Sequence, residues 1–70
     1  MPSQDFYLQR GSTYQALGDH RSAIADFDVS IDFFPGSPQG YYARSASRRV
    51  LGDIKGAEAD HKIAQGFDGR

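Results

Sequence analysis

Apolar side chains recur along the chain three or four positions apart, which is the spacing of one face of an α-helix. The first two stripes consist of Tyr7, Gly11, Tyr14 and Leu17, and then of Ile24, Phe27, Ile31 and Phe34. The pattern predicts four helices, near residues 4–17, 20–34, 38–51 and 54–66, with residues 66–70 as a frayed tail.

The breaks between the expected helices carry residues that suit helix ends. Gly18 and Gly52 can adopt the left-handed conformation that closes a helix, and Asp19 and Asp53 can cap the next helix. Pro35 follows the second stripe and cannot continue it. Each pair of helices is therefore expected to form a helix-turn-helix hairpin.

The chain repeats itself with a period of 34 residues. Alignment of residues 4–36 with residues 38–70 gives nine identities, whereas chance gives roughly two for such a composition. The identical pairs are Tyr7/Tyr41, Arg10/Arg44, Leu17/Leu51, Gly18/Gly52, Asp19/Asp53, Ala23/Ala57, Ala25/Ala59, Asp26/Asp60 and Phe33/Phe67. The sequence thus contains two copies of one hairpin, at about 4–37 and 38–70, within a single domain of residues 1–70.

Two features of the repeat predict contacts inside each hairpin. Arg10 and Asp26 are 16 residues apart, as are Arg44 and Asp60, which suggests one internal ion pair in each copy. Small residues recur where the two helices must approach, and the expected contacts are Gly11 with Ala23, and Ser45 with Ala57.

The first copy resembles a tetratricopeptide repeat. The residues that match the family pattern are Tyr7, Gly11, Tyr14, Ala23, Phe27 and Pro35, with Arg10 in place of a leucine. The second copy departs more, because Ser45, Arg48, His61 and Gly69 replace four of these residues. The resemblance implies an all-α fold, in which two tandem hairpins form a short right-handed α-solenoid, and a non-enzymatic role as a scaffold for protein–protein interaction.

In this family the first helices of successive hairpins line a concave surface that receives a peptide segment or helix of a partner. By this resemblance the partner-binding residues would be Asp5, Leu8, Gln9, Ser12, Gln15, Gln39, Tyr42, Ala43, Ala46 and Arg49. Tyr42 and Arg49 are the expected anchors, since these residue types are enriched among those that dominate binding energy. Binding to the C-terminal carboxylate of chaperones is not expected, because the chain has no asparagine and both its lysines, Lys55 and Lys62, lie in the last helix.

The last helix has the character of an end cap, because Glu58 and Gln65 replace the apolar Ile24 and Ile31 of the first copy. Two repeats are fewer than the three or more that such folds usually need. An apolar patch with Phe6, Leu8, Phe33 and Phe34 can therefore remain partly uncovered. Three alternatives stay open: the chain forms a homo-oligomer, it is part of a longer array, or its own packing is adequate.

Composition narrows the choice of partner. The formal net charge is −1, so the chain offers no bulk attraction to nucleic acid or an anionic membrane. Arg48 and Arg49 are candidates for contact with an acidic ligand, although a solvated face is the commoner fate of such charges. No segment reads as a secretion signal or a membrane span. We expect a soluble, intracellular protein of the cytoplasm that binds proteins rather than nucleic acid or membrane.

No motif predicts an enzyme, a cofactor or a metal. The segment from Asp26 to Ser37 imitates the start of a calcium loop, but Ile31 and Ser37 occupy the places of the required glycine and glutamate. His20 lies in a turn, and His61 takes the place of Phe27, where we expect a partly buried ring with one hydrogen bond. We therefore predict no catalytic, cofactor-binding or metal-ligating residue.

Overall fold

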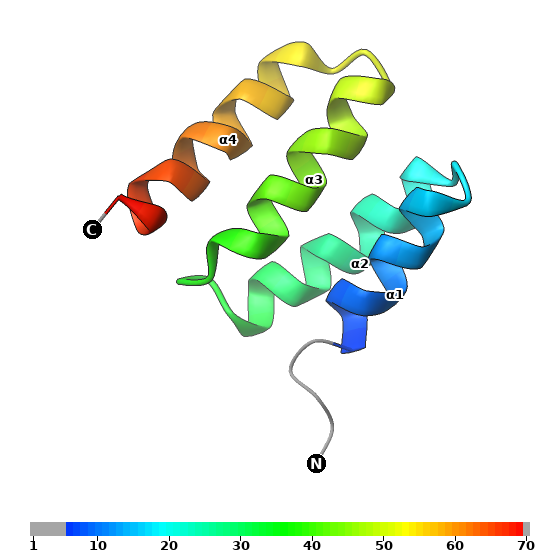
Figure 1. The fold of residues 1–70 in the computed structure, drawn as a ribbon, viewed down its shortest axis with the longest axis horizontal. Helices are drawn as coiled ribbons and strands as arrows, with labels where there is room; N and C mark the ends of the chain where they lie inside the picture. Colours follow the sequence, from blue (N-terminus) through cyan, green and yellow to red (C-terminus); the bar gives the residue numbers. More distant parts are fainter. Residues whose placement is uncertain (1–5, 70) are drawn as a thin grey trace.

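The computed structural model describes residues 6–69, and over these residues the chain is all-α. Its helices are α1 (Phe6–Ala16), α2 (His20–Phe33), α3 (Pro38–Val50) and α4 (Ile54–Asp68), arranged as two consecutive hairpins (Figure 1). The predicted fold class is confirmed. Residues 4 and 5, which were expected to begin the first helix, lie outside the described residues. A frayed tail was predicted for residues 66–70. This prediction was wrong for residues 66–69, because α4 continues to Asp68 and the Gly69 amide donates to the Gln65 carbonyl.

Both hairpin turns are built as the sequence predicted. Gly18 and Gly52 have φ angles of +82° and +89°, a region that side-chain-bearing residues rarely adopt. The carboxylates of Asp19 and Asp53 accept hydrogen bonds from the backbone amides of Ser22 and Gly56, at the starts of α2 and α4. The two turns are therefore structural equivalents.

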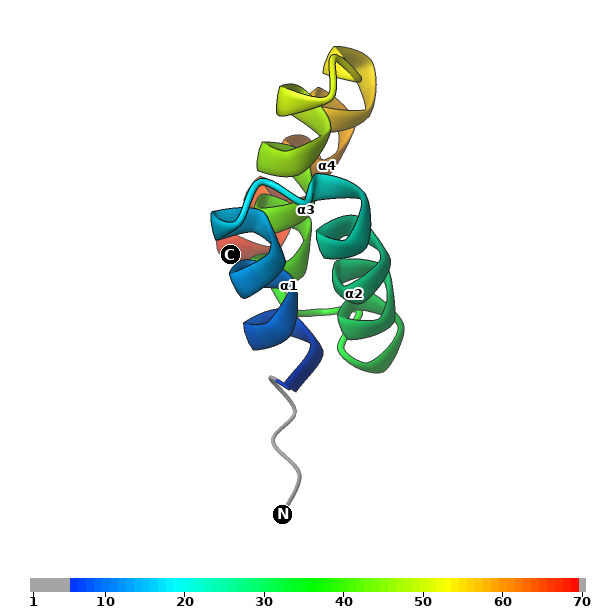
Figure 2. The ribbon, with the colours of Figure 1, turned by 90° about the vertical axis from the view of Figure 1, so that its right-hand side faces the viewer.

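Each helix packs against the next one in the sequence, and α3 is the central helix because it contacts all three other helices (Figure 1). In the orthogonal view α1 and α2 lie side by side, with α1 toward one face of the molecule and α2 toward the other (Figure 2). Direct contact between α1 and α3 is slight. The first helices of the two hairpins consequently leave space between them on one face.

The core is small, and its fully buried apolar side chains in the described part of the chain are Ala23, Phe27, Ala57 and Ala64. Phe27 lies directly against Gly11, where an added Cβ would come within 2.6 Å of the ring. The atoms nearest to such a Cβ belong to Phe27 and Asp26. The predicted contact of Gly11 with Ala23 stays a prediction. Leu17 was expected to end the first helix, but α1 ends at Ala16 and Leu17 is exposed in the turn.

The second hairpin packs differently from the first because Ser45 replaces Gly11. The Ser45 hydroxyl donates to the Ala57 carbonyl at 2.8 Å, which confirms the predicted contact between these residues. The serine occupies space that Gly11 leaves open for the Phe27 ring. His61, the equivalent of Phe27, is accordingly exposed and meets the edge of the Tyr42 ring, so its predicted partial burial was wrong.

The two outer faces of the hairpin pair differ in polarity. Glu58 and Gln65 are exposed polar residues on α4. At the other end Phe6 and Phe33 are 49% and 63% exposed, and Phe33 stacks on Tyr7. Two members of the expected apolar patch, Phe6 and Phe33, are therefore uncovered at the start of α1 and the end of α2.

Candidate functional site

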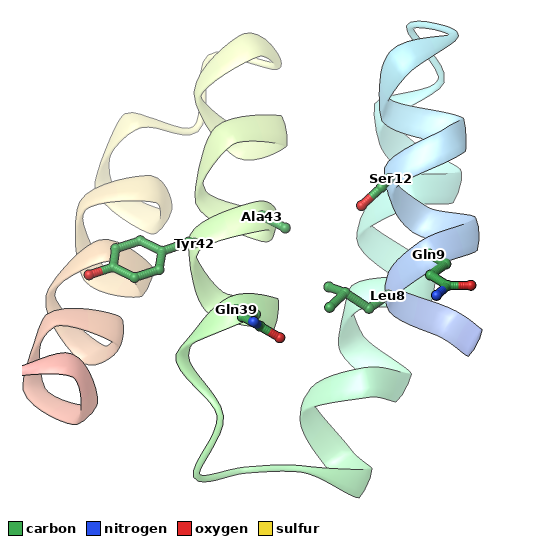
Figure 3. A pocket seen from close by; sticks show the side chains of 6 residues that line it. All are labelled: Leu8, Gln9, Ser12, Gln39, Tyr42 and Ala43. Atoms are coloured by element: carbon green, nitrogen blue, oxygen red, sulfur yellow. The ribbon is translucent and has the colours of Figure 1, made fainter. Parts of the chain in front are cut away.

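A shallow hollow of about 680 Å³ opens between α1 and α3. Its lining residues, all of which were predicted to face a partner, are Leu8, Gln9, Ser12, Gln39, Tyr42 and Ala43. Leu8 and Ser12 point from α1 toward α3, whereas Gln39 and Ala43 point from α3 toward α1 (Figure 3). The hollow has an apolar floor with amide and hydroxyl groups, and none of its lining residues carries a formal charge.

Tyr42 forms one side of this hollow in a way that the sequence does not reveal. Its ring extends toward α4 rather than toward α1 (Figure 3), and its hydroxyl donates to Asp68 Oδ2 at 3.0 Å. The His61 ring lies edge-on at 5.3 Å. Partial burial, followed by the hydrogen bond to Asp68, raises the pKa of Tyr42 above its ordinary value. Tyr42 is therefore a fixed wall of the hollow.

The other predicted contact residues lie outside the hollow or outside the described chain. The Gln15 amide donates to the Ala43 carbonyl at 2.9 Å and to Ser47 Oγ at 2.8 Å, so both its donor hydrogens serve the junction between the hairpins. Ala46 and Arg49 are exposed farther along α3. Asp5 lies outside the described residues.

The two predicted Arg–Asp pairs are confirmed and have the same geometry. Arg10 donates through Nε and Nη2 to Asp26, both at 2.8 Å. Arg44 donates through the same two atoms to Asp60, at 2.9 and 2.7 Å. Because both bonds favour the charged guanidinium, hydrogen bonding raises the pKa of each arginine above its ordinary value. The Nε and Nη2 atoms of both arginines are therefore used inside their own hairpins.

Asp60 also accepts a hydrogen bond from a second arginine. Arg48 Nη1 donates to Asp60 Oδ2 at 2.9 Å, and Arg44 Nη1 reaches across the hairpin junction to Asp28 Oδ1 at 2.7 Å. Arg48 was a candidate for ligand contact, but its guanidinium is used inside the second hairpin. Arg49 makes no ion pair with any described residue. Of the two arginines, it is therefore the one that remains a candidate for ligand contact.

The acidic part of the segment that imitates a calcium loop is helical, because Asp26, Asp28 and Asp32 all lie within α2, which ends at Phe33. Two of these carboxylates bind arginine. Between residues 6 and 69 no group of three or more acidic or histidine side chains is placed to hold a metal ion.

The chain was compared with known families and structures. No protein-family model matches it, and no solved structure matches it. Within the described residues no helix has both the length and the apolar character needed to cross a bilayer.

Proposed function

We propose that the hollow between α1 and α3 binds an extended segment or helix of a partner protein, as the tetratricopeptide resemblance implies. The observation that carries this proposal is the convergence of Leu8, Ser12, Gln39 and Ala43 from two separate helices on one open space. Such a surface offers apolar contact together with hydrogen-bonding groups, which is the make-up of a peptide-binding groove. The proposed role is recognition without a chemical step.

The lining chemistry indicates what the bound segment should carry. Since the hollow contains no formal charge, the inserted side chains should be apolar or small, with polar atoms that pair with Gln39 and Ser12. Arg49 lies beyond the hollow on the same helix and can add one contact to an acidic residue downstream in the ligand.

The test is a selection of displayed peptides against the 70-residue chain, followed by affinity measurement with matched variants. Ser12→Glu places a charge in the hollow at an exposed position, and Ala59→Glu places the same charge on the exposed outer side of α4. We expect the first change to weaken the selected peptides at least tenfold and the second to leave binding unaltered. Equal effects of the two changes would refute the groove assignment.

The exposed rings of Phe6 and Phe33 favour a second candidate, in which the chain associates with copies of itself. Burial of these rings would add stability to a domain with a small core. Sedimentation from low to high micromolar concentration tests this directly, and an unchanged monomer eliminates it.

A further inference from the structure

The junction between the two hairpins shows what one hairpin requires from its neighbour. Arg44 Nη1 donates to Asp28 Oδ1 across this junction at 2.7 Å. Gly40 lies so close to α2 that an added Cβ would approach Ile31 Cγ1 to 2.9 Å. Because the hairpins repeat every 34 residues, Arg10 and Phe6 are the positions on the outer face of α1 that correspond to Arg44 and Gly40.

Arg10 makes the same two hydrogen bonds inside its hairpin as Arg44 does, but it does not make the third bond, which joins Arg44 to the neighbouring hairpin. Both arginines use Nε and Nη2 inside their own hairpin. Arg44 Nη1 then binds the preceding hairpin, whereas Arg10 Nη1 has no hydrogen-bond partner among residues 6–69. The Arg10 side chain is accordingly 48% exposed, compared with 15% for Arg44.

Aromatic rings surround the open guanidinium. The Arg10 Cζ atom lies 5.3 Å from the centre of the Phe6 ring, 5.6 Å from that of Tyr7 and 5.9 Å from that of Tyr14. These contacts and the Asp26 pair hold the guanidinium in place before any ligand arrives. A carboxylate that approaches Nη1 therefore meets an oriented donor beside an apolar surface.

A second copy of the chain does not fit this face by head-to-tail stacking. The helix that such a copy would present is α4, where Lys62 stands in the place of Asp28 and Gln65 in the place of Ile31. Lys62 would meet Arg10, and like charges at contact distance oppose association. Phe6 would also replace Gly40, where even a single added carbon is already too close to its neighbour.

We infer that the outer face of α1, formed by Phe6 and Arg10, binds an amphipathic helix of a different chain. The bound helix carries an acidic residue opposite Arg10 Nη1, as Asp28 lies opposite Arg44. Three positions later it carries a small residue, because the Phe6 ring fills the space that Gly40 leaves for Ile31. This face is distinct from the hollow, whose α1 residues are Leu8, Gln9 and Ser12.

A peptide copied from α2 tests the inference with the full chain. The probe spans residues 19–35, with Ile31→Ala to admit Phe6 and Asp26→Ser to remove a competing carboxylate. The control differs from it only by Asp28→Lys, which imitates α4. Each is titrated to millimolar concentration into isotope-labelled protein, since an isolated helix of this length is marginally stable and binds weakly.

We expect saturable shifts in the amide signals of Phe6, Tyr7 and Arg10 with the acidic probe, and at least tenfold weaker binding of the lysine control. Phe6→Ala in the protein should reverse the preference at the small position, so that a probe retaining Ile31 binds better than the alanine form. The inference is overturned by the absence of saturable shifts, by equal affinities of the two probes, or by shifts confined to Leu8 and Ser12.

Discussion

Removal of the Asp60 charge should destabilise this protein more than any other substitution that leaves the size of a side chain unchanged. Its side chain is only 2% exposed and accepts three hydrogen bonds, two from Arg44 and one from Arg48. Asp60→Asn keeps the volume but removes the charge, and it turns an amide group toward two guanidinium ions. Breaking a buried ion pair by removing one partner typically costs about 3–5 kcal/mol, because the remaining charge is left uncompensated.

The expected loss lies at the lower end of that range. Arg44 keeps its bond to Asp28, and Arg48 is 29% exposed and can reach water. We therefore expect Asp60→Asn to lower the free energy of unfolding by about 3 kcal/mol. A domain of this size is rarely stabilised by more than about 3–5 kcal/mol. The variant should be largely unfolded, or close to it, at 25 °C.

The repeat supplies a matched control. Asp26 occupies the same place in the first hairpin, but it binds only Arg10, which is half exposed and returns to water easily. Urea unfolding followed by far-ultraviolet circular dichroism should show a clearly smaller loss for Asp26→Asn than for Asp60→Asn. A third variant, Asp28→Ala, removes only an exposed partner of Arg44 and should cost no more than about 1 kcal/mol. Equal losses of stability in Asp26→Asn and Asp60→Asn would refute the claim that the burial of the arginine partners and the third hydrogen bond determine how much stability is lost.

Two further predictions concern packing and pH. Gly11→Ala should destabilise the protein by about 1–3 kcal/mol because the added carbon meets the buried Phe27 ring, whereas Gly66→Ala, with open space around it, should be neutral or stabilising by thermal denaturation. The pKa of Tyr42 is raised on folding, so its contribution is fully present below the unfolded value near 10 and is lost as pH rises through the folded value. Tyr42→Phe should therefore reduce the fall in stability at alkaline pH, and ultraviolet titration should show that this change removes a tyrosine whose pKa is raised.

The sequence was sufficient for features that depend on local chemistry and on the repeat. The positive φ angles at Gly18 and Gly52 and the capping by Asp19 and Asp53 follow from residue type at a helix end. The Arg44–Asp60 pair follows from a spacing that occurs twice. Six of the ten residues that the resemblance implied for partner contact line the hollow, because helical periodicity fixes which side of α1 and α3 they occupy.

Features that depend on a particular side-chain direction could not be predicted. Tyr42 was expected to face the groove as an anchor, but its hydroxyl reaches Asp68, which lies 26 residues away and in a different helix. From the sequence, Asp60 was assigned to Arg44, and Arg48 therefore had no partner. Only the structure shows that the Asp60 carboxylate accepts hydrogen bonds from both arginines. His61 was misplaced because a single substitution, Ser45 for Gly11, changes where its ring can lie.

The differences between the two copies then explain why the molecule has two unlike ends. Identical hairpins would present matching faces, and such heterologous contacts continue without limit when they do not close into a ring. In this chain Lys62 replaces Asp28 on the α4 face, while Phe6 replaces Gly40 on the α1 face. Both changes alter positions that form the internal junction, where Asp28 binds Arg44 and Gly40 approaches Ile31. The same substitutions that oppose head-to-tail growth leave Arg10 with one donor open, so the α1 end can accept an acidic helix in place of α4 from a second copy.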